Sequence, residues 1–166
     1  MKPGFFQSLS QWTSELEALS EAQLRLRPLH GGWTLGQLYV HLIADTRFYV
    51  EQIRLCLAGN DHADGKMTTE AEEMFRNNAF PDIRIEGDPS HATMRQPESK
   101  MELMQGFKSI RSAMEQVADE IVVATHHGKT RHPGFGYFSA QDWFQFADMH
   151  LRHHVRQKRR IVEGSR

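Results

Sequence analysis

The stretch that decides the fold, residues 139–163, reads SAQDWFQFADMHLRHHVRQKRRIVE. An α-helix turns by about 100° per residue, and four side chains of this stretch then fall within about 60° of one another. They are Trp143, Ala147, His150 and His154. Two histidines therefore continue an apolar stripe, and we predict one amphipathic helix from Ser139 to about Glu163 with His150 and His154 facing the core.

Apolar residues at helical spacing predict three further helices, at about residues 5–19, 34–58 and 99–125. Thr34 and Gln37 have the spacing of a capping box at the start of the second. No alternation typical of a strand reaches comparable length. We expect an all-α fold, a four-helix bundle that forms a single domain over residues 1–166.

A long polar connection, from about residue 60 to residue 96, joins the second and third of these helices. It contains Pro81 and Gly87-Asp88-Pro89, and its one short helical candidate runs from Thr69 to Asn77. Connections of this length are uncommon in compact domains unless they have a function. A lid over a site and a simple crossover both remain open.

Composition narrows the classes of function. A formal net charge of −1 gives no basic face for a nucleic acid, so no nucleic-acid partner is expected. No apolar run is long enough to cross a membrane and the start of the sequence has no signal-peptide core, so we expect a cytoplasmic protein without a membrane partner. The one cysteine, Cys56, lies in an apolar run and is interpreted as a small core residue.

A third histidine would turn the pair on the last helix into a metal site. His41 lies about 10 Å from the start of the second helix and His154 about 13 Å from the end of the last, so antiparallel packing would bring them level. Three neutral imidazoles bind zinc, nickel or iron and leave a position for water or substrate. The alternative is that His150 and His154 form only hydrogen bonds within the core. His153 is expected at the flank of the last helix.

Asp45 lies one turn beyond His41 on the same face of the second helix. We consider it a candidate catalytic residue, either orienting the imidazole or acting as acid or base beside the metal. A solvated helix carboxylate is the alternative.

At these residues the sequence resembles the DinB superfamily, which includes bacillithiol transferases and mycothiol-dependent isomerases. The resemblance spans the chain and rests on Gly32-Trp33-Thr34-Leu35-Gly36-Gln37 leading to His41, and on His150-x-x-His153-His154-x-x-Gln157. It implies a DinB-type four-helix bundle with the long connection between helices two and three. It also implies that His41, His150 and His154 bind the metal, and we expect a divalent transition metal there, zinc or nickel before iron.

The segment His132-Pro133-Gly134-Phe135-Gly136 resembles one branch of the superfamily with a His-Pro-x-Phe-Gly entry to its last helix. Pro133 and the two glycines predict a turn. His132 is interpreted as a residue of that turn, with a place at the mouth of the site as the alternative.

The preferred function is a metal-dependent enzyme that transfers a low-molecular-weight thiol to a small electrophile. The thiol would be a separate molecule, since Cys56 is not placed among the ligands. A metal-dependent hydrolase and a bundle that binds metal or a small ligand without turnover are the alternatives. A further reading is a homodimer with exposed Phe135, Tyr137 and Phe138 at the interface.

Overall fold

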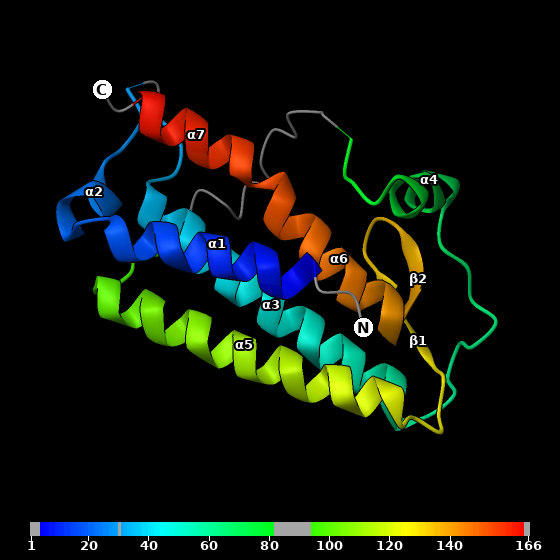
Figure 1. Ribbon diagram of the computed structural model, residues 1–166. Helices are drawn as coiled ribbons and strands as arrows, with labels where there is room; N and C mark the ends of the chain where they lie inside the picture. Colours follow the sequence, from blue (N-terminus) through cyan, green and yellow to red (C-terminus); the bar gives the residue numbers. More distant parts are fainter. Residues whose placement is uncertain (1–3, 30, 82–93, 165–166) are drawn as a thin grey trace.

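The computed structural model describes residues 4–29, 31–81 and 94–164. Its elements, shown in Figure 1, are α1 (Gly4–Ala18), α2 (Glu21–Arg25), α3 (Leu35–Ala58), α4 (Thr69–Asn77), α5 (Lys100–Val122), β1 (Lys129–His132), β2 (Gly136–Ser139), α6 (Ala140–His153) and α7 (Val155–Gly164). The chain is mostly helical, which confirms the predicted all-α class. No helix within these described ranges is long and apolar enough to cross a membrane.

The four longest helices pack around one apolar core. Helix α3 contacts both α5 and α6, and α1 contacts the same two helices from the other side. In Figure 1, α3 and α6 run in opposite directions, as the three-histidine prediction required. The core includes the fully buried side chains of Trp12, Leu38, Tyr39, Phe107 and Trp143.

Helix α3, which carries His41, begins as predicted. The Thr34 hydroxyl accepts a hydrogen bond from the Gln37 amide at 3.1 Å, and the Gln37 carboxamide oxygen accepts one from the Thr34 amide at 3.0 Å. Gln37 Nε2 also donates to the Met94 carbonyl at 2.6 Å. This capping box therefore fixes the start of α3 and joins it to the segment that precedes α5.

The predicted last helix is not continuous, and its interruption lies at a candidate ligand. Helix α6 ends at His153 and α7 begins at Val155, so the prediction of one helix to Glu163 was wrong at this point. In an unbroken helix the Leu151 carbonyl would accept from the Val155 amide. It accepts instead from the indole nitrogen of buried Trp12, at 3.1 Å. A side chain inserted into the hydrogen-bond ladder is a known cause of such breaks.

The turn-rich stretch before α6 is a β-hairpin, which the sequence did not predict. Strand β1 pairs antiparallel with β2, with Thr130 opposite Phe138. Gly136 has a φ of 84°, and a Cβ there would lie 2.6 Å from the Lys66 carbonyl oxygen, so the hairpin requires glycine at this position. Phe138 is fully buried, which corrects its expected place at an exposed dimer interface.

The remaining differences concern the connections. A short helix, α2, follows α1 and was not predicted, although Ser20 and Gln23 form a complete capping box at its start. Helix α4 has the predicted bounds, Thr69 to Asn77. The part of the long connection at residues 82–93 lies outside the described residues.

Candidate metal centre

Three histidine rings meet between α3 and the junction of α6 and α7. The Nε2 atom of His41 lies 3.2 Å from that of His150 and 3.2 Å from that of His154, and the last two are 3.0 Å apart. His41 and His150 are buried and His154 is half-buried. The structure thus brings together the three residues that the sequence singled out, and they form a group that could hold a metal ion.

The separations of these nitrogens fit a shared ion. Two nitrogens that each lie 2.0 to 2.1 Å from one ion, at angles from octahedral to tetrahedral, are about 2.8 to 3.4 Å apart. All three observed distances fall in this range. The donor set, three imidazoles, suits borderline divalent metals.

The tautomer of His154 also fits metal binding. Its Nδ1 lies 2.7 Å from the side-chain oxygen of Gln157, on the first turn of α7. An amide oxygen accepts a hydrogen bond, so Nδ1 carries the ring proton and Nε2 presents its lone pair to the cluster. Gln157 therefore orients the ring of this candidate ligand. It lies three residues after His154, a spacing that brings side chains together on a helix, and the sequence motif contained it without a role.

His150 is held neutral by its surroundings. Burial, and then the neighbouring histidines, place the pKa of His150 well below its usual value. Its Nδ1 is fully buried and has no hydrogen-bond partner among the described residues. A neutral ring is the form that binds a metal.

Asp45 lies beside the histidines. One carboxylate oxygen is 3.4 Å from Nε2 of both His41 and His150. Asp45 is not in the group whose ligand atoms all lie within 4.8 Å of one another. Burial raises the pKa of Asp45 to about 6, although 38% of its side chain remains exposed. This position favours a role in the site over that of a solvated helix carboxylate.

Aromatic side chains surround the cluster, and sequence reasoning gave them no role. The Trp33 ring lies 5.0 Å from that of His41, and the rings of Tyr49 and Phe80 lie 5.6 and 6.4 Å from that of His150. Burial, and then the charge of Asp45, raise the pKa of Tyr49 well above its usual value, so the phenol stays protonated. Trp33 was part of the sequence motif that leads to His41, and Tyr49 lies on the helix face of His41 and Asp45, as a core residue also could. Phe80 lies outside the helices, so the helical repeat could not place it.

Other candidate residues lie apart from the cluster. His153 is outside the three-histidine group, and its ring packs on Phe80 at 4.9 Å. Cys56 is buried under the hairpin, where its thiol donates to the Phe138 carbonyl at 3.5 Å. His132 ends strand β1 and begins the predicted turn, where its carbonyl accepts from the Phe135 amide at 3.4 Å, and its ring lies among those of the hairpin and α6.

His132 predicts a dependence of stability on pH. Burial lowers its pKa from 6.5 to about 4, and its Nδ1 accepts a hydrogen bond from the Gly134 amide at 3.0 Å. Between these two pH values the unfolded chain binds a proton that the folded chain does not. The free energy of unfolding should therefore fall by about 1 to 3 kcal/mol as the pH drops from 6.5 to 4, after allowance for partial exposure.

Urea unfolding of metal-free wild type and His132→Phe across this range measures the effect. The variant keeps a ring in the aromatic cluster but cannot be protonated, so its stability should fall less than that of the wild type. Parallel curves for the two proteins would contradict the assignment to His132.

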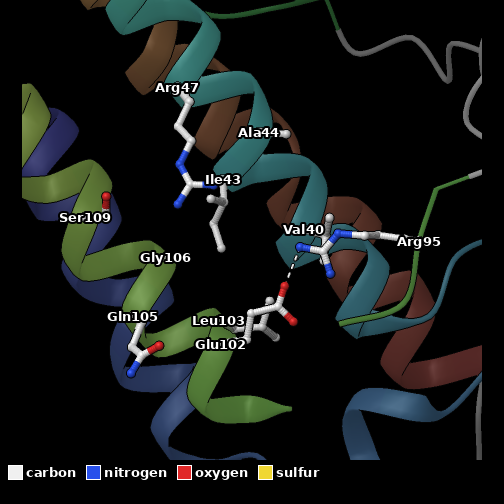
Figure 2. Close-up of a pocket in the computed structure, with 10 residues that line it drawn as sticks. All are labelled: Val40, Ile43, Ala44, Arg47, Arg95, Glu102, Leu103, Gln105, Gly106 and Ser109. Carbon is white, nitrogen blue, oxygen red and sulfur yellow. Dashed lines mark hydrogen bonds and ion pairs between the residues drawn. The ribbon is translucent and has the colours of Figure 1, made fainter. Parts of the chain in front are cut away.

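A separate groove of about 530 Å³ lies on another flank of α3, against α5. Figure 2 shows Arg95 paired with Glu102 at one end, Arg47 on α3, and Ile43 between the two helices. None of the three clustered histidines lines it. The groove is thus distinct from the candidate metal centre.

The comparisons with known proteins identify a family. The model of the DinB superfamily matches residues 7–157, a span that includes all three histidines and Asp45. The search of curated proteins found no match.

Proposed function

Because the chain belongs to the DinB superfamily, we propose that its three-histidine cluster holds a divalent transition metal ion and that the protein transfers a low-molecular-weight thiol to a small electrophile. Zinc and nickel are the preferred metals, with iron third. The convergence of three Nε2 atoms within 3.0 to 3.2 Å supports the metal most strongly. A cation between the three nitrogens would let each ring present its Nε2 lone pair without the repulsion that three such lone pairs would otherwise feel.

The bound ion would supply positive charge that favours the thiolate over the thiol. Asp45 would accept the thiol proton. This role is supported by its carboxylate, which contacts two of the three histidines and is partly open to solvent. The sulfur then forms a bond to the electrophilic carbon. The bond from that carbon to the leaving group breaks, and the leaving group departs with the electron pair. The proton passes from Asp45 to the leaving group or to water.

The chain's own thiol does not fit this role. Cys56 is buried against the hairpin, and its thiol contacts Phe138 and Thr130 rather than the histidines. Burial also raises the pKa of Cys56 above its usual value, which disfavours the reactive thiolate. This supports a separate thiol molecule as the nucleophile.

The test uses protein purified without a histidine tag. Elemental analysis should find about one divalent metal per chain. The loaded protein is then incubated with 1-chloro-2,4-dinitrobenzene and each of cysteine, glutathione, bacillithiol and mycothiol, and the thioether is followed by mass spectrometry. Metal-dependent thioether formation with at least one thiol is expected. If the protein binds metal and hydrolyses a nitrophenyl ester but transfers no thiol, the proposed function would be that of a metal-dependent hydrolase instead of a transferase.

Asp45→Asn should separate proton transfer from metal binding. The amide keeps the shape of the side chain but is a poor proton acceptor, so metal content should be retained while thiol transfer falls about 10- to 100-fold. Elemental analysis and initial rates measure the two effects.

Asp64→Asn is the matched control, because Asp64 is an exposed aspartate in the loop before α4. It should change neither quantity. Loss of metal from Asp45→Asn would indicate that Asp45 is a metal ligand. An unchanged rate of thiol transfer would indicate that Asp45 is only a solvated carboxylate.

A further inference from the structure

Tyr49 lies on the face of α3 that carries the candidate centre. It follows Asp45 by four residues and His41 by eight, which places all three along one stripe of the helix. Its ring meets that of His150 edge-on, with centroids 5.6 Å apart and planes at 89°. Side chains on a helix lean toward its N-terminus, so the phenol leans toward the turn that holds Asp45.

The ring is fixed by packing. It stacks on buried Trp143 with centroids 5.7 Å apart and an angle of 27° between the planes, and Phe146 meets it edge-on at 5.4 Å. Only 5% of Tyr49 is exposed. The hydroxyl therefore has a set position, and a molecule bound beside His150 would meet a donor that needs little rearrangement.

The hydroxyl of Tyr49 makes no hydrogen bond to any part of the chain that the structure describes. Buried tyrosines usually find a partner. Tyr39, on the same helix, does so by donating to the Trp12 carbonyl at 3.3 Å. Among the described residues, two side-chain atoms are both fully enclosed and without a partner, His150 Nδ1 and Arg152 Nη2. The Tyr49 oxygen has no partner but is not one of these two, so it borders accessible space.

We propose that the Tyr49 hydroxyl donates a hydrogen bond to the small molecule that binds at the three-histidine centre. This inference rests on the proposed function, because the partner it requires is a ligand of that centre. The atom that it recognises carries negative charge, such as a thiolate sulfur or an anionic oxygen. A hydrogen bond to a charged acceptor is stronger than one to a neutral acceptor.

Tyr49→Phe removes only the oxygen, and Tyr39→Phe is the matched control from the core of the same helix. Both variants and the wild type are loaded with cobalt(II) and titrated with azide, a small anion, while the visible spectrum is recorded. Tyr49→Phe should bind cobalt as the wild type does but bind azide about 10-fold more weakly. Tyr39→Phe should leave azide binding unchanged.

Thermal unfolding of the metal-free proteins gives a second, independent readout. Tyr39→Phe breaks an existing hydrogen bond and should lower the melting temperature, whereas Tyr49→Phe should leave it near that of the wild type. Equal azide affinity in wild type and Tyr49→Phe would overturn this inference and leave the proposed function standing. Loss of cobalt from Tyr49→Phe would also overturn it, by making Tyr49 a structural support. A cobalt-loaded wild type that binds no azide would overturn the accessible centre itself, and the inference with it.

Discussion

Replacing His150 or His154 with alanine is expected to remove most of the bound metal. Each change deletes one of three nitrogens that lie 3.0 to 3.2 Å apart, and the remaining two do not form a chelate of comparable strength. Removal of a residue that only hydrogen-bonds to a metal ligand typically lowers metal affinity 10- to 100-fold. Loss of a ligand itself should lower the metal affinity by more than that. Elemental analysis and a competition titration with a chromophoric chelator measure the loss.

His153→Ala is the matched control for these variants. His153 lies between the two residues in sequence, and its ring contacts the rings of Phe80 and His154. It does not belong to the three-histidine group, so the variant should retain nearly all of the metal. Equal losses from all three variants, or no loss from any, would reject the assignment of the ligands.

The candidate site could be found from the sequence because its essential geometry is local. Spacing on a helix places His150 and His154 on one face, and the depth argument pairs them with His41 once the helices run in opposite directions. Asp45 followed from the same face of α3. Each inference required only the helical repeat and the direction of two helices.

The parts that were missed depend on contacts between distant residues. Sequence near Leu151 contains no proline or glycine to break a helix, and the break instead accompanies a bond from Trp12, which lies 139 residues earlier. Strands β1 and β2 have four residues each, too few for an alternating pattern, and their pairing is supported by a bridge from Met67 to Gly136.

Trp12→Ala should lower the free energy of unfolding by about 3 to 5 kcal/mol, the range for truncating a large buried aromatic side chain. The ring is 1% exposed and packs edge-on against Tyr39 at 5.4 Å, and Lys158 Nζ lies 4.5 Å from its centre. Packing should account for most of the loss. Chemical denaturation of the metal-free protein measures it.

Trp12→Phe separates packing from the hydrogen bond to the Leu151 carbonyl. It keeps an aromatic ring but no N–H donor, so it should lose about 1 to 2 kcal/mol, mainly for the bond. A loss as large as that of alanine would make the bond, not the ring, the dominant contribution.

Trp12→Phe also frees the Leu151 carbonyl. The Val155 amide is the first of α7 and has no partner within its own helix, so it can then bond to that carbonyl. Hydrogen exchange of the Val155 amide should therefore be slower in Trp12→Phe than in the wild type. Unchanged exchange would mean that Trp12 does not maintain the break at His154.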